Sequence, residues 1–238
     1  MIARQTPTRR ICMRRVFVHS QGFKMSRLTS VALALLVLTL PACKIVKTPE
    51  AGQSAAATTG EAGDDTRISA LLDKTLTADL LPHVAQNARP VPELRAAIAA
   101  GLDTAGEQFG HRGAGAGAAW NFAVTGEGRV VEANLTSRAR KAMLDTDGDG
   151  KSDITLQLGP VIKGTALRDF APFYDFNDFR DQIEFAKLGR AINDRVSAAL
   201  VVPEGELAGQ TLRFVGAFDL KAPDDPWLVT ATTLQVVP

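Results

Sequence analysis

The sequence predicts a mainly β, α+β fold. We expect an OB-fold-like, five-stranded Greek-key barrel with a helix between strands three and four, preceded by two N-terminal helices. Apolar residues recur at helical spacing up to about residue 110, and alternation typical of strands begins near residue 120. The later segments then follow the order strand, strand, strand, helix, strand, strand, which is the order of an OB barrel. An α+β sandwich built from the same elements is the alternative fold.

The two N-terminal helices are expected within residues 65–110. Asp64 or Asp65 is available as an N-cap for the first helix. Pro82 lacks a backbone N–H, so it should kink or end that helix. The second helix is expected over residues 93–102. The apolar positions of the first helix are Ile68, Leu71, Leu72, Leu76, Leu80 and Leu81.

Strand-like segments fill most of the remaining chain. The first is long and should be bent or bulged at Gly126 and Gly128, because glycine tolerates the backbone angles of a bulge. The helix between strands three and four should start near Asn177 or Asp178, either of which can cap it, and end before Pro203. The expected strands cover residues 121–135, 138–144, 154–167, 212–220 and 227–237.

The first 42 residues have the pattern of a bacterial lipoprotein signal peptide. A basic start is followed by an apolar run from Val31 to Leu40 and then by Leu-Pro-Ala-Cys43. The apolar run is shorter than the roughly 20 residues that span a bilayer, but it suits the central region of a signal peptide. Cys43 is therefore the predicted lipidation site. Met25 is the expected start, and the residues before it are interpreted as a spurious extension.

Behind the leader, the chain is expected to form one tethered domain. Residues 43–64 are rich in Gly, Ala, Ser and Thr, which predicts a flexible tether. The single folded domain covers residues 65–238, with the helical part at 65–110 and the barrel at 118–238. Its lipid would anchor it to a membrane in the periplasm, since no second apolar stretch follows. Lys44 rather than Asp follows the lipidated cysteine, which slightly favours the outer membrane.

The near-neutral charge of the whole chain conceals an acidic mature protein. The chain has 27 Lys and Arg against 26 Asp and Glu residues, and seven of the basic residues but none of the acidic ones lie in residues 1–42. Removing the leader leaves 20 basic against 26 acidic residues, a net charge of −6. Binding to nucleic acid depends on neutralising phosphates with Lys and Arg, so no nucleic-acid partner is expected.

One Asp-rich turn, just before the strand that starts at Ile154, has the spacing of a calcium loop. Alternating carboxylates on a tight loop can converge on one hard cation, and Gly150 permits the sharp turn. The twelfth position is Leu156, where an EF-hand has a bidentate Glu, so an EF-hand is not expected. An exposed hairpin turn is the alternative interpretation, because such turns favour Asp and Gly. The predicted calcium ligands are the carboxylates of Asp145, Asp147, Asp149 and Asp153 and the carbonyl of Lys151.

Candidate ligand-facing residues are few. Lys163 and Arg168 lie in a Gly-Pro-containing segment and could face a ligand, although a bulged strand turning the barrel corner is the favoured interpretation. Trp120 could stack on a saccharide, though core packing is the commoner role of such aromatic residues. The mixed charges of residues 178–190 are interpreted as a solvated helix face. The histidines of the mature chain lie in different segments, and the sequence has no recognisable nucleophile–base set, so no catalytic residue is assigned.

Several motifs together resemble the family of predicted periplasmic lipoproteins of unknown function, whose genes often lie beside sugar ABC-transporter genes. The resemblance covers essentially all of the mature chain and implies a periplasmic location and a link to sugar uptake, without an activity or catalytic residues. The motifs are Cys43-Lys-Ile-Val, Trp120-Asn-Phe-Ala-Val, Asp147-Gly-Asp-Gly-Lys-Ser-Asp153, Gly159-Pro-Val-Ile-Lys-Gly-Thr-Ala-Leu-Arg-Asp169 and Phe176-Asn-Asp-Phe with Gln182-Ile-Glu-Phe-Ala.

These observations favour a non-enzymatic accessory lipoprotein. Its expected partners are a membrane, through the lipid, and a sugar ABC transporter, a solute-binding protein or a saccharide, since OB barrels offer a concave face to oligosaccharides. The alternative is a calcium-stabilised structural or interaction module of the cell envelope. A glycoside-acting hydrolase is the remote alternative.

Overall fold

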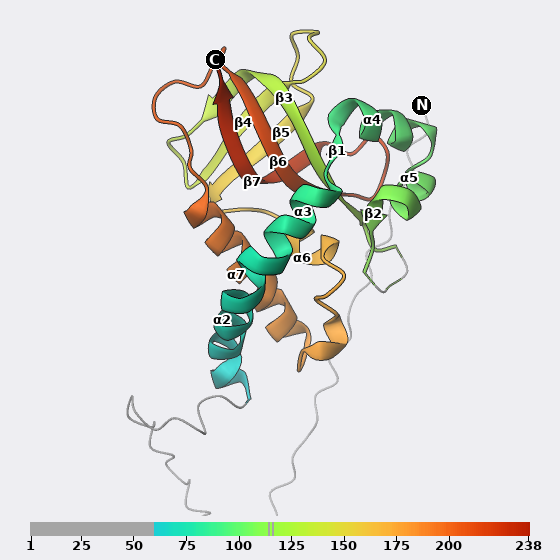
Figure 1. Cartoon of the computed structure of the whole chain (residues 1–238), viewed down its shortest axis with the longest axis vertical. Coiled ribbons are helices and arrows are strands. Elements are labelled where there is room, and N and C mark those ends of the chain that lie inside the picture. The colour runs from blue at the N-terminus through green and yellow to red at the C-terminus, as the bar shows by residue number, and fades with distance from the viewer. Residues whose placement is uncertain (1–59, 114, 116) are drawn as a thin grey trace, which may run out of the picture. The chain divides into compact units, whose positions relative to one another are not determined.

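The computed structural model describes residues 60–113, 115 and 117–238 (Figure 1). The predicted leader, the predicted lipidation site Cys43 and most of the predicted tether lie outside the described residues. The helices are η3 (Glu61–Gly63), α2 (Asp64–Thr75), the π-helix η4 (Leu76–Leu80), α3 (Leu81–Asn87), α4 (Val91–Ala100), α5 (Leu102–Phe109), α6 (Ala166–Phe170), η5 (Phe176–Asp178) and α7 (Gln182–Ala199). The strands are β1 (Arg89–Pro90), β2 (Gly110–His111), β3 (Trp120–Asn134), β4 (Ala139–Asp145), β5 (Ile154–Pro160), β6 (Thr211–Leu220) and β7 (Trp227–Val237).

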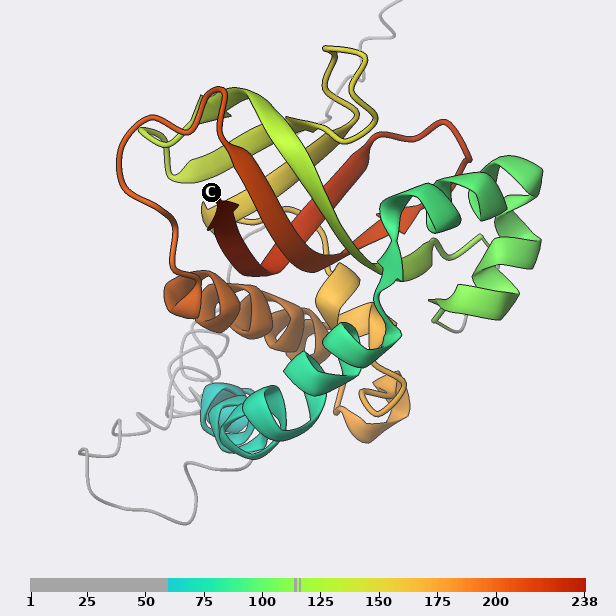
Figure 2. The same ribbon diagram turned by 45° about the horizontal axis from the view of Figure 1, so that its top comes forward.

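Five strands close into a barrel in the order β3–β4–β5–β7–β6, with β6 pairing back onto β3. Every neighbouring pair is antiparallel except β5 and β7, which run parallel. The long helix α7 lies between β5 and β6 in the chain (Figure 2). The predicted OB barrel, with its helix between the third and fourth strands, is therefore confirmed.

Two apolar clusters follow from the alternation of the strands. Phe122 and Val124 on β3, with Phe218 on β6, point into the barrel and join one core. Ala123 and Ala217 point outward on the same two strands and join a second core with the helices. Their small side chains let α3 and α6 pack directly on the outer face of the barrel. Helices α2 and α7 complete this second layer below the barrel (Figure 2).

The N-terminal part holds more helices than the two predicted. Pro82 does not end the first helix, because the π-turn of η4 precedes it and the proline lies in the first turn of α3, where its missing N–H costs little. The chain thus continues as α2, η4 and α3 before α4 and α5. Helix α2 starts at Asp64, which is one of the two residues expected to cap it.

Other predicted boundaries are wrong for local reasons. β3 shifts register against β4 between Val130 and Glu132, not at Gly126 or Gly128. At Gly126 the glycine instead makes room for Val91, whose Cγ2 would lie 2.7 Å from an added Cβ. The third strand ends at Pro160, residues 161–165 form a loop, and α6 begins at Ala166.

Helix α7 begins later than predicted. Its N-cap is Asp181, whose carboxylate accepts hydrogen bonds from the backbone N–H groups of Ile183 and Glu184. Asn177 and Asp178 belong instead to the short helix η5. Among the residues that the structure describes, no helix is both long and apolar enough to cross a membrane.

The close packing of β6 against β7 can be tested at Gly216. A Cβ added at Gly216 would overlap the carbonyl oxygen of Thr230 and lie 2.7 Å from Cγ1 of Val229. Because overpacking of this kind typically costs about 1–3 kcal/mol, we expect Gly216→Ala to lower the free energy of unfolding by that amount in a urea titration. Gly113→Ala is the control, since an added Cβ meets nothing within 4 Å there. Equal stability of the two variants would contradict the packing described.

Candidate functional site

The Asp-rich turn between β4 and β5 brings three of its predicted ligands together. Carboxylate oxygens of Asp145, Asp147 and Asp149 lie within 4.8 Å of one another. Asp145 is buried and accepts hydrogen bonds from the backbone N–H of Gly148 at 2.6 Å and of Gly150 at 2.9 Å. The Gly148 hydrogen bond, followed by that of Gly150, outweighs burial and holds the pKa of Asp145 below its usual value. The turn therefore keeps a carboxylate ionised at its base.

Of the other predicted ligands, the carboxylate of Asp153 does not join this group. The carboxylate of Asp153 accepts a hydrogen bond from the hydroxyl of Thr146 at 2.8 Å and lies 3.0 Å from the guanidinium of Arg95. The side chain of Lys151 is exposed, and its backbone N–H donates to Asp149 at 2.7 Å. Arg95 thus neutralises the fourth carboxylate, and three carboxylates remain available to a cation.

A second site lies where the barrel meets α6 and the segment before α7. A pocket of about 650 Å³ opens there, and Arg168 is one of the residues that line it. Its other charged and polar lining residues come from distant parts of the chain. They include His111 from β2, Asn121 from β3, Asp169 from α6, and Asp219 and Lys221 at the end of β6. We call this cavity the Arg168 pocket.

Arg168 and its neighbours form a rigid polar wall. The Nε of Arg168 donates to Asp169 at 2.7 Å, and its Nη1 donates to the carbonyl of Phe185 at 2.9 Å. Its guanidinium lies 3.8 Å from the centre of the Phe185 ring, a cation–π arrangement. The hydroxyl of Thr165 donates to the second oxygen of Asp169 at 2.6 Å. These contacts fix both charged groups before any ligand arrives.

Two other lining residues, His111 and Asp219, offer acceptors. His111 Nδ1 lies 2.6 Å from the carbonyl oxygen of Asp169, so a proton on Nδ1 donates there and Nε2 is left as an acceptor. Asp219 stands at the rim, directly across the β3–β6 pairing from Asn121. Desolvation by the pocket walls, and then the negative charge of Asp169, raise the pKa of Asp219. A hydrogen-bond donor on a ligand would relieve this unfavourable charge.

Two predicted ligand-facing residues lie outside this pocket. The ring of Trp120 packs on the backbone of Gly106, and its Nε1 donates to Asp103 at 2.8 Å. Arg112 covers the ring at 4.4 Å, so Trp120 has mainly a packing role on α5. Lys163 is exposed on the loop after β5, and its backbone N–H and carbonyl are both bound by the side chain of Gln157.

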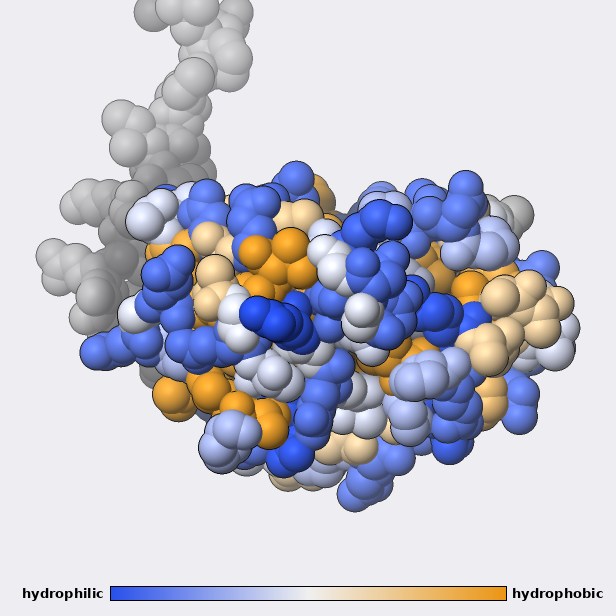
Figure 3. Space-filling view, turned by 90° about the horizontal axis from the view of Figure 1, so that it is seen from above, coloured by the Kyte–Doolittle hydropathy of each residue, from blue (hydrophilic) through white to orange (hydrophobic). Residues whose placement is uncertain are grey.

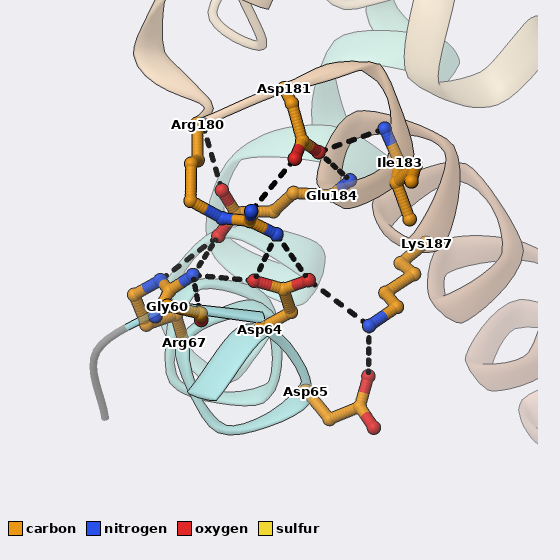
Figure 4. Close-up of polar contacts among 9 residues, drawn as sticks. All are labelled: Gly60, Asp64, Asp65, Arg67, Arg180, Asp181, Ile183, Glu184 and Lys187. Atoms are coloured by element: carbon orange, nitrogen blue, oxygen red, sulfur yellow. Dashed lines mark hydrogen bonds and ion pairs between the residues drawn. The ribbon is translucent and has the colours of Figure 1, made fainter. Parts of the chain in front are cut away.

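The outer wall of the Arg168 pocket is the segment 171–181, which we call the strap. A buried ion cluster fastens the end of the strap to the first turn of α2 (Figure 4). Asp64, with no exposed side-chain surface, accepts hydrogen bonds from Arg67 at 2.6 Å and from Arg180 and Lys187 at 3.0 Å. Glu184 accepts from Arg67 and from the backbone N–H of Arg180.

The ion cluster lowers the pKa of Asp64, the carboxyl group at its centre. Burial alone raises the pKa of Asp64, but the hydrogen bonds from Lys187 and Arg180 outweigh it and lower the pKa below its usual value. Glu184 is only 4% exposed, so the interpretation of this helix face as solvated is wrong at that position. The error has a physical cause, because Asp64 is more than a hundred residues from its partners Arg180 and Lys187 in the sequence.

Sequence reasoning also missed most of the Arg168 pocket. His111, Asp169 and Asp219 belong to three segments whose proximity depends on barrel closure, and single residues of these types carry no local signal. The one available indication was the unusual density of Asp, Asn and Phe in the strap, from Phe173 to Phe179. That composition suits a surface that both stacks and hydrogen-bonds.

Comparisons with known proteins agree with this architecture. Residues 33–235 match the family described as "Predicted periplasmic lipoprotein (DUF2291)", and the chain belongs to that family. The membership suggested by the sequence motifs is therefore confirmed. A crystal structure of an OB-fold protein from Thermotoga maritima is similar, with a TM-score of 0.51 and 16% identity over 73% of this chain and 96% of that chain. At this identity the similarity shows the fold alone. No curated protein matches the chain.

The ion cluster gives a pH-dependent prediction. Because the pKa of Asp64 is lowered on folding, its stabilising contribution is present above its unfolded-state pKa and is lost as the pH falls through its folded-state pKa. We expect Asp64→Asn to lower the melting temperature by several degrees at pH 7, and the difference from wild type to shrink below about pH 4.

Asp65→Asn is the matched control for this experiment. The side chain of Asp65 is 89% exposed and lies 4.0 Å from Lys187, so its loss should change the melting temperature little at either pH. A difference between wild type and Asp64→Asn that stayed constant from pH 7 to pH 3 would contradict the assigned role of the Asp64 charge.

Proposed function

We propose that this periplasmic lipoprotein is a non-enzymatic solute-binding component of sugar uptake, and that the Arg168 pocket holds the sugar. The single observation that carries the proposal is the pocket itself. Its volume of about 650 Å³ lies within the range of roughly 300–1,000 Å³ typical of small-molecule sites. It combines fixed charged groups with the partly exposed ring of Phe176.

The chemistry of the pocket suits a polyhydroxylated ligand. Each sugar hydroxyl can donate and accept a hydrogen bond, so it is best met by alternating donors and acceptors. Asp219 and Nε2 of His111 supply acceptors, while Arg168 and Lys221 supply donors. Charge-assisted hydrogen bonds to such groups are about twice as strong as neutral ones. Phe176 and the ring of Phe185 beneath Arg168 add apolar surface for the carbon faces of a sugar ring.

A binding role is preferred over hydrolysis for a reason within the site. Glycoside hydrolysis uses two carboxyl groups, one as acid and the other as base or nucleophile. In this pocket both oxygens of Asp169 are engaged, one by Thr165 and one by Arg168. Asp219 has the raised pKa of a general acid. Asp175 is the third carboxylate that lines the pocket, and one of its oxygens accepts hydrogen bonds from the backbone and side-chain N–H groups of Asn177. A glycoside-acting hydrolase stays the remote alternative, because one of the three lining carboxylates has both oxygens engaged.

The link to a transporter is part of the same proposal. A lipid-anchored binding protein would present its sugar to a permease or to a soluble solute-binding protein at the membrane. Capture experiments with the full-length lipoprotein, from membranes of cells grown on different sugars, should recover such a partner reproducibly. Recovery that does not change with the sugar and is matched by an unrelated lipoprotein would contradict this link.

Sugar binding is tested directly by calorimetry with a panel of mono- and disaccharides. For the sugar that binds, we expect Asp219→Asn to weaken the affinity about 10- to 100-fold, because a hydrogen bond to a charged group contributes roughly 1.5–3 kcal/mol and each 1.4 kcal/mol is tenfold. Asp224→Asn, an exposed residue on the next loop, is the matched control and should bind normally. No binding of any sugar, or equal loss in both variants, would refute the assignment.

The Asp-rich turn supports a second candidate, a calcium-stabilised module of the envelope. The supporting observation is the set of three carboxylate oxygens within 4.8 Å, since calcium binds clustered carboxylates. We expect calcium to raise the melting temperature relative to chelator, by an amount that grows with calcium concentration. A ligand at 100 times its dissociation constant adds about 2.7 kcal/mol.

Two neighbouring variants separate a metal site from an ordinary turn. Asp149→Asn should abolish the calcium response and leave the melting temperature in chelator nearly unchanged, because the Asp149 side chain is half exposed. Asp153→Asn should instead lower the melting temperature in both conditions, since it breaks the contact with Arg95. If calcium leaves the wild-type melting temperature unchanged, the turn is structural only.

A further inference from the structure

The most prominent apolar side chains on the surface gather in one short stretch. Among the described residues, the large apolar side chains exposed by 40% or more are four valines dispersed along the chain and three bulkier residues. Those three lie within the strap and the first turn of α7. They are Phe173, 40% exposed, Phe176, 47% exposed, and Ile183, 55% exposed. We call these three residues the aromatic tip.

This stretch adjoins the point where the chain enters the described domain. Gly60, the first described residue, lines a groove of about 620 Å³ together with Phe173 and Phe179. The guanidinium of Arg67 donates to the carbonyl oxygen of Gly60 at 3.1 Å, which fixes the entry point beside the ion cluster. Figures 1 and 2 both place the start of α2 and the strap at the same end, below the barrel.

From these observations we propose that the aromatic tip is a membrane-contact surface that rests on the bilayer carrying the lipid anchor. Cys43, the predicted lipidation site, precedes Gly60 by 17 residues, a length that spans at most about 60 Å when fully extended. The anchor therefore keeps the lipid surface within reach of the domain. It also raises the effective concentration of that surface, so even a weak apolar contact is populated.

The charges at this end select the kind of bilayer. Arg67, Arg180 and Lys187 are each about one-third exposed, but they are matched by acids inside the cluster. Asp181 pairs with Arg180 at 2.8 Å, and Asp175 and Asp178 are exposed on the strap. These acids outnumber the three basic residues, so the surface gains nothing from anionic lipids. The contact is therefore with a bilayer rich in zwitterionic phosphatidylethanolamine and depends on apolar insertion rather than on charge.

Among the described residues, the bulkier exposed apolar side chains occur only in the aromatic tip. In the view from above, hydrophobic residues occur in patches separated by hydrophilic ones (Figure 3). Val201, although 79% exposed, follows the opposite end of α7. An 18-residue helix is about 27 Å long, so Val201 is well separated from the aromatic tip. Its exposure and its distance make it a suitable control position.

The test measures contact with lipid at single positions. Lipidated full-length protein is placed in vesicles of phosphatidylethanolamine with a minor phosphatidylglycerol fraction, and mass spectrometry first verifies the acyl group on Cys43. Tryptophan is introduced by Phe176→Trp, by Ile183→Trp and, as the control, by Val201→Trp. The emission of Trp120 and Trp227 is subtracted using wild-type protein. Because interfacial side chains reach about 5–10 Å into the headgroup region, the vesicles carry lipids brominated near the glycerol backbone.

We expect the added emission of Phe176→Trp and Ile183→Trp to fall to about half or less with brominated lipids, and that of Val201→Trp to stay unchanged. Raising the salt concentration should leave this quenching intact, because charge does not drive the contact. Quenching at none of the positions, equal quenching at all three, or quenching lost in high salt would each overturn the proposal. Circular dichroism of each variant establishes that the domain is folded, and the two tip positions provide independent readings.

Discussion

The double pairing of β3 is the constraint on which the rest of the structure depends. Its first part, Trp120–Arg129, pairs with β6, and its last part, Arg129–Asn134, pairs with β4. One strand thus closes the barrel and leaves none of the five strands with a long free edge. The same pairing sets Asn121 opposite Asp219 and holds β2, with His111, beside them. The Arg168 pocket is built on the end of the pairing that closes the barrel.

The helical layer depends on a different kind of interaction. A buried charge such as Asp64 is costly to desolvate, so a cluster of this type is weak evidence for overall stability. What the cluster determines is position, because the guanidinium of Arg180 can satisfy Asp64 only when the strap reaches α2. The N-cap Asp181 and the backbone N–H of Arg180 then start α7 at a defined residue. Polar contacts therefore set the location of the strap, and apolar packing of α7 on the barrel supplies the burial.

The sequence predicted the barrel well because its signals are local. Alternation in β5 and β6, and the order of the elements, depend on neighbouring residues only. The start of α7 was misplaced because several Asp and Asn residues there can cap a helix, and the choice of Asp181 is made by contacts with α2. Residues 161–167 read as a strand because of their apolar content, but residues 161–165 form a loop, and Leu167 packs in the helical layer as part of α6. Of the predicted site residues, Arg168 lines the Arg168 pocket, whereas the ring of Trp120 packs on Gly106.

Phe176 connects the two proposals and makes them interdependent. Its ring lines the Arg168 pocket, packs edge-on against Phe185 and is also part of the aromatic tip. A ring drawn into lipid is less available to a sugar, and a ring held by a sugar is less available to lipid. Linkage then requires the coupling to be reciprocal, since whatever factor the membrane applies to sugar affinity, the sugar applies to membrane contact. A domain resting on the bilayer would release its sugar more readily there than in the open periplasm, which is the direction that delivery to a permease needs.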